Sequence, residues 1–96
     1  GQIPINPETG EIIDISIEDA TQQVLKNMQA IIETAGYNIT DIAKVTLFIK
    51  NMEHFSKINT IYEIFFNGHK PARAVVEVSR LPKDVLIEAE CIAVKS

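Results

Sequence analysis

The sequence predicts one α+β domain, with two helices on one face of a mixed sheet and the element order β-α-β-α-β-β. Two observations lead to this prediction: apolar residues recur at helical spacing in two segments and alternate at every second position in three others. Every Pro and Gly falls at a boundary between these segments, and there are no repeats or low-complexity tracts. Residues 1–96 are therefore expected to form a single domain.

The helical segments are predicted at residues 17–35 and 52–66. Ser16 can cap the start of the first helix, and Gly36 can supply the left-handed residue that ends it. Residues 2–5 are expected to be the end of a strand, because the turn residues at 6–10 follow them. The stripe of the first helix that is expected to be buried comprises Ile17, Ala20, Val24, Met28, Ile31 and Ala35.

The alternating segments predict strands at residues 43–51, 72–79 and 85–95. Right-handed crossovers between parallel strands should bring both helices to one face of the sheet, where they meet the more apolar side of each strand. The opposite face is then half apolar and half charged, which is typical of an oligomer interface that holds a polar site. It would carry Lys44, Thr46, Phe48, Lys50, Arg73, Val75, Glu77, Glu88, Glu90, Ile92 and Val94.

Arg73 and Glu88 are the candidate catalytic pair. The alternation of their strands predicts that both lie on the face away from the helices, roughly 5 to 10 Å apart. At that distance an arginine could bind a substrate carboxylate while a glutamate held a water over the adjacent carbon. The same spacing is more typical of an exposed ladder of ion pairs among Arg73, Glu77, Glu88 and Glu90, and the residues alone leave both interpretations open.

Composition argues against several other classes of protein. A net charge of −4 disfavours a nucleic acid partner, because affinity for nucleic acids comes largely from Lys and Arg. Residues 1–4 resemble no signal peptide and no apolar run could span a membrane, so a cytoplasmic location is expected. The single cysteine, Cys91, is expected to pack as a small hydrophobic residue. His54 and His69 have no neighbouring ligands at metal-binding spacing, so no metal is expected.

The stretch 71–84, PARAVVEVSRLPKD, and the IEAE sequence at 87–90 resemble the signature of the reactive intermediate deaminase family. This family is also called the endoribonuclease L-PSP or translation-inhibitor family. The resemblance extends over the whole chain and includes residues 1–4, 9–11, 59–62 and 65–66. It implies a chorismate-mutase-like fold and a homotrimer with a site at each subunit interface. It also implies a short N-terminus, because members carry further residues there that form the first strand and most of the second.

The activity implied by the resemblance is hydrolysis of reactive enamines and imines, such as 2-aminoacrylate and 2-iminobutanoate, to 2-keto acids and ammonia without a cofactor. Arg73 would bind the carboxylate and Glu88 would position the water. Asn59 matches a position near the site, and the backbone of Gly1 is expected to approach the ligand. Val75 stands where many members have a cysteine. The alternatives are a regulatory module that binds small carboxylates without turnover and, less favoured by the acidic charge, an endoribonuclease or translation inhibitor.

Overall fold

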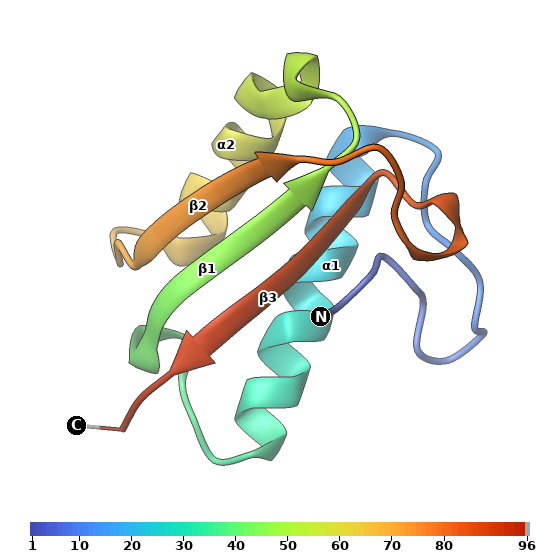
Figure 1. Ribbon diagram of the computed structural model, residues 1–96. Helices are drawn as coiled ribbons and strands as arrows, with labels where there is room; N and C mark the ends of the chain where they lie inside the picture. The colour runs from blue at the N-terminus through green and yellow to red at the C-terminus, as the bar shows by residue number, and fades with distance from the viewer. Residues whose placement is uncertain (96) are drawn as a thin grey trace.

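The computed structural model describes residues 1–95 and has two helices on one face of a three-stranded sheet (Figure 1). The strand order is β2-β1-β3, with β1 parallel to β2 and antiparallel to β3. This architecture confirms the predicted fold class. The elements are α1 (Ile17–Thr34), β1 (Ile42–Ile49), α2 (Phe55–Phe66), β2 (Ala72–Glu77) and β3 (Ile87–Ala93).

The N-terminal segment extends the sheet beside β3 through a single antiparallel bridge. The amide of Gln2 donates to the Ala89 carbonyl at 2.6 Å, and the Ala89 amide donates to the Gln2 carbonyl at 2.9 Å. Asn27, a buried polar residue of α1, donates to the carbonyls of Ile3 at 3.0 Å and Ile5 at 2.8 Å. These bonds satisfy the buried amide of Asn27 and hold the segment between α1 and β3.

The ends of α1 are formed as predicted. The Ser16 hydroxyl accepts a hydrogen bond from the Asp19 amide at 3.1 Å, and Gly36 has a φ of +91° just after the helix. The buried stripe agrees with the prediction as far as Met28, but Ile32 is buried in place of Ile31, which is 57% exposed. Both residues border an open hollow beside the N-terminal segment, but Ile32 also packs into the core cluster.

The core is built on the central strand β1. Val45, Leu47 and Ile49 of this strand are fully buried, as their alternation predicts, and they pack beneath the two helices with Ile87 and Ala89 of β3. Residues directly opposite each other on neighbouring strands point to the same side of a sheet. The burial of β1 therefore decides which side chains of β2 and β3 face the helices.

The predicted orientation of β2 is wrong. Arg73 lies opposite Val45 and Val75 lies opposite Leu47, so both point towards the helices, and Val75 packs against the core. Ala72 and Ala74, which were expected to face the helices, point away from them. A physical reason is that an alanine gains little from burial, whereas the long arginine side chain can cover aromatic rings of α2 and still reach water. Apolar alternation is therefore a weak guide to the orientation of this strand.

The central position of β1 predicts a large difference between two isoleucine substitutions. Ile49→Ala should lower the free energy of unfolding by about 2 to 5 kcal/mol, because Ile49 is fully buried and its removal leaves a cavity. Ile64→Ala is the matched control, since Ile64 is 74% exposed on α2, and it should change stability by less than about 1 kcal/mol. Urea unfolding followed by circular dichroism would measure both values, and equal losses would contradict this description of the core.

Candidate active site

Arg73 is held against α2 by one hydrogen bond and two aromatic rings. Its Nη1 donates to Oδ1 of Asn59, and its guanidinium carbon lies 5.4 Å from the ring centroid of Phe55 and 4.8 Å from that of Tyr62. Both distances are within the range of cation–π attraction. The side chain is therefore oriented in advance, yet Arg73 remains exposed, so its other N–H groups can reach a ligand.

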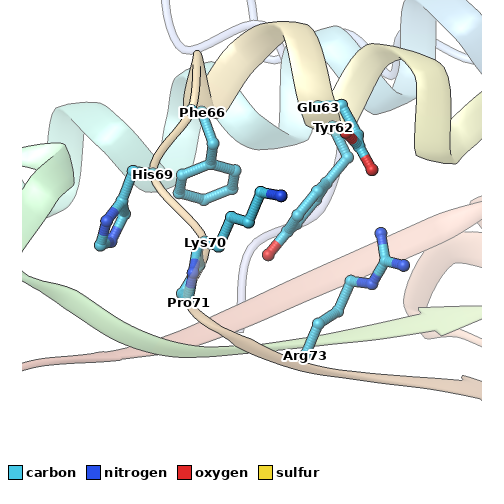
Figure 2. A pocket seen from close by; sticks show the side chains of 8 residues that line it. Tyr62, Glu63, Phe66, His69, Lys70, Pro71 and Arg73 are labelled. Carbon is cyan, nitrogen blue, oxygen red and sulfur yellow. The ribbon is translucent and has the colours of Figure 1, made fainter.

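A pocket of about 310 Å³ opens beside this arginine, between the C-terminal half of α2 and the start of β2 (Figure 2). Tyr62 and Phe66 form an aromatic wall, and Pro71 and Arg73 border it on the side of the strand. The two rings lie close together, with centroids 4.6 Å apart. The pocket thus joins an apolar wall to a cationic edge, which is typical of sites for small polar ligands.

The hydroxyl of Tyr62 is buried and has no hydrogen-bond partner among residues 1–95. A buried hydroxyl without a partner costs about 1 to 3 kcal/mol. Burial raises the pKa of this hydroxyl, and the positive charge of Arg73 acts in the opposite direction. A raised pKa keeps the group protonated at neutral pH, so it can donate a hydrogen bond to an acceptor that enters the pocket.

Glu88 belongs to a second group of residues, on β3. It lies opposite Phe48 of β1, and the bridge between Gln2 and Ala89 brings Gly1 against its carboxylate. A Cβ atom at Gly1 would overlap that carboxylate, so a glycine allows the close approach. The predicted site residues therefore form two groups: Arg73 with Asn59 and Val75, and Glu88 with Gly1.

The structure of the chain does not bring Arg73 and Glu88 together, which contradicts the predicted distance of roughly 5 to 10 Å. Arg73 shares its face with buried Val45, whereas Glu88 pairs with Phe48, which points away from the helices. Two strand spacings and an offset of three residues along the strands separate their Cα atoms by about 14 Å. A small metabolite cannot contact both side chains on the opposite faces of one sheet.

The alternative ladder of ion pairs is absent from residues 1–95. The ion pairs in this part of the chain join Lys57 to Glu18 at 3.9 Å and Arg80 to Asp84 at 2.9 Å. Glu77 instead accepts a hydrogen bond from the Met52 amide at 2.7 Å, at the turn that precedes α2. Arg73 and Glu88 thus have no carboxylate or cation as an ion-pair partner within the described residues.

Phe55 and Tyr62 were missed as site residues, because aromatic residues in an apolar helix are expected to pack in the core. The spacing of residues along this helix nevertheless indicated a polar site. Phe55, Asn59 and Tyr62 are spaced by four and three residues, so they lie on one stripe of α2. A polar asparagine between two aromatic residues on one helix face indicates a polar partner, which here is Arg73.

Neither a metal-binding cluster nor a membrane-spanning helix occurs among the described residues. Within residues 1–95, no three His, Cys, Asp or Glu side chains gather closely enough to hold a metal ion. His69 has its ring Nε2 2.8 Å from the Ile42 carbonyl, so this nitrogen donates to the backbone. No helix among these residues is long and apolar enough to cross a membrane.

Comparison with known proteins decides the family. The family model described as endoribonuclease L-PSP matches residues 1–95. The chain belongs to this family. A RutC family protein from Pyrococcus horikoshii is 58% identical over 95 residues, which are 99% of this chain and 75% of that protein.

The chain is also similar to two Escherichia coli proteins. The protein named 2-iminobutanoate/2-iminopropanoate deaminase from strain K12 is 50% identical over 99 residues, covering 99% of this chain and 76% of its own length. The crystal structure of TdcF with bound serine superposes with a TM-score of 0.95 at 45% identity, covering 100% of this chain and 77% of TdcF. The predicted family resemblance is therefore confirmed.

The position of Cys91 predicts a slowly reacting thiol. Cys91 packs partly buried against the core, and burial raises the pKa of its thiol, although the N-terminal charge acts in the opposite direction. A higher pKa leaves less thiolate at pH 8, so labelling with Ellman's reagent should be at least about 10-fold slower in the folded protein than in urea. Equal rates in the folded and unfolded protein would show that folding neither shields the thiol from the reagent nor raises its pKa.

Proposed function

We propose that this L-PSP family member hydrolyses small 2-imino acids to 2-keto acids and ammonia. The observation that supports this most directly is the fixed position of Arg73, which is oriented by Asn59 and two rings while its remaining donors stay accessible. A guanidinium held in this way can bind a carboxylate through two parallel hydrogen bonds. The relatives at about 50% identity that are named deaminases support the same reaction.

The active site would form between two copies of the chain. Arg73 and Glu88 point from opposite faces of one sheet, so a ligand that contacts both must take each from a different protomer. The face that carries Glu88 also exposes Ile92 and Val76, at 58% and 41%, which suits burial against another subunit. We infer a homotrimer in which Arg73 of one protomer and Glu88 of the next share each site.

The reaction in such a site needs only binding and proton transfer. Arg73 would hold the carboxylate of the imino acid, and Glu88 would accept a proton from a water that attacks the imine carbon. The resulting carbinolamine carries a hydroxyl and an amino group on the same carbon. The amino group forms when Glu88 returns the proton to the imine nitrogen. Glu88 then moves the hydroxyl proton to the amino group, so that the C–N bond breaks, ammonia leaves and the keto group forms.

A non-catalytic regulator would use the same arginine to bind a 2-keto acid without turnover. Affinity for 2-ketobutyrate measured by calorimetry, together with no keto acid release from imines, would favour that function. The family name also includes endoribonuclease, but a net charge of −4 opposes RNA binding and the His69 Nε2 already donates to the backbone. RNA degradation that is lost on repurification would indicate a contaminant, and degradation that survives both repurification and Arg73→Ala would indicate an activity outside the proposed site.

Replacing Arg73 should remove most of the activity. Arg73→Ala should lower kcat/KM for enzymatically generated 2-iminobutanoate by at least about 100-fold, because two charge-assisted hydrogen bonds to the carboxylate are lost. Arg80→Ala is the matched control: Arg80 is exposed and pairs with Asp84, and its loss should change kcat/KM by less than about 2-fold. Full activity of Arg73→Ala, compared at equal oligomer mass, would contradict the role of this arginine.

A mixing experiment tests the shared site. Arg73→Ala and Glu88→Gln should each be inactive alone, but subunits mixed in equal amounts and reassembled should recover about a quarter of the wild-type activity. A quarter is expected because each interface needs an intact Arg73 from one subunit and an intact Glu88 from its neighbour. No recovery from a mixture shown by mass spectrometry to contain hybrid trimers would mean that both residues come from the same subunit.

A further inference from the structure

The pocket beside Arg73 has a second positive side chain on its border. Lys70 lines the pocket from the loop before β2, and Figure 2 shows the Tyr62 hydroxyl pointing into the space between Lys70 and Arg73. This hydroxyl is the buried donor that lacks a partner among residues 1–95. The only acidic residue on the pocket wall is Glu63, which is exposed. The pocket therefore has an excess of positive charge and an unused hydrogen-bond donor.

We propose that this pocket binds the distal carboxylate of the substrate, so that the protein favours 2-imino acids whose side chain ends in a carboxylate. The inference rests on the proposed function, in which Arg73 binds the carboxylate next to the imine. The side chain of such a substrate would extend along the aromatic wall, and its terminal carboxylate would accept hydrogen bonds from Lys70 and the Tyr62 hydroxyl.

The chemistry of the pocket wall favours a carboxylate over an apolar group. A carboxylate has two oxygens and can accept from both donors at once, whereas a methyl group would leave the buried hydroxyl unsatisfied. A protonated tyrosine hydroxyl is also a stronger donor to an anion than to a neutral acceptor. Lys70 is exposed and flexible, so it can close over a bound carboxylate without a change in the backbone. The pocket of about 310 Å³ is larger than a methyl or ethyl side chain requires.

Two stable keto acids that differ only at the far end of the chain provide the test. 2-Oxoglutarate carries a terminal carboxylate where 2-oxopentanoate has a methyl group. Calorimetry on the wild-type protein should show at least about 10-fold tighter binding of 2-oxoglutarate, because a hydrogen-bonded ion pair is added. Lys70→Met, which keeps the length and removes the charge, should abolish this preference while changing the affinity for 2-oxopentanoate by less than about 2-fold.

Two further variants complete the design. Lys57→Met is the matched control, because Lys57 lies on α2, pairs with Glu18 and does not line the pocket, so the preference should survive. Tyr62→Phe keeps the ring beside Arg73 and should weaken the preference about 3-fold without loss of stability, since an unsatisfied hydroxyl is removed. A wild-type protein without the preference, or a preference that survives both Lys70→Met and Tyr62→Phe, would overturn the proposal.

Failure of the proposed function would give a different result. If 2-iminobutanoate is not hydrolysed and neither 2-oxoglutarate nor 2-oxopentanoate binds, the deaminase activity and the binding of a carboxylate by Arg73 are both rejected. The pocket can then be tested with glutarate, which has no keto group, by following the NMR signals of residues 62–73. Shifts that disappear in Lys70→Met would support the carboxylate pocket alone, and no shifts in the wild-type protein would reject it.

Discussion

The pairing of β1 with its two neighbours determines which face of the sheet carries Arg73, Val75 and Glu88. Because the apolar residues of β1 must face the helices, their partners Arg73 on β2 and Ala89 on β3 face the helices as well. Glu88, which precedes Ala89, therefore points away from them. A slip of one residue in either pairing would exchange these faces and destroy the core at the same time. The separation of the arginine from the glutamate is thus a direct consequence of core packing.

Most of the fold could be predicted from the sequence because α1, α2 and β1 each bury one well-defined face. The cap at Ser16, the helix end at Gly36 and the apolar face of β1 are local signals, and the structure confirms them. The orientation of β2 could not be predicted in this way. One face of β2 carries small apolar residues and the other carries Arg73. The contacts of Arg73 with Phe55 and Tyr62 of α2 fix which face meets the helices, and local alternation does not predict such contacts.

The geometry of the candidate site could not be predicted from the sequence. Arg73, Asn59 and Val75 lie on the helix side of the sheet, and Gly1 lies against Glu88. The predicted distance of roughly 5 to 10 Å between Arg73 and Glu88 within one chain is wrong, because the side chains of β2 face the opposite way from the prediction. A single chain therefore shows the two groups of residues on opposite faces of the sheet.

The packing of Arg73 between a strand and two rings affects how tightly a small ligand can bind. A free arginine side chain loses up to about 2 kcal/mol of conformational entropy when it is fixed in one rotamer. Here much of that loss occurs during folding, when Asn59 and the rings of Phe55 and Tyr62 restrict the side chain. A ligand with few atoms can therefore convert more of its contact energy into affinity, which matters most where the ligand makes few contacts.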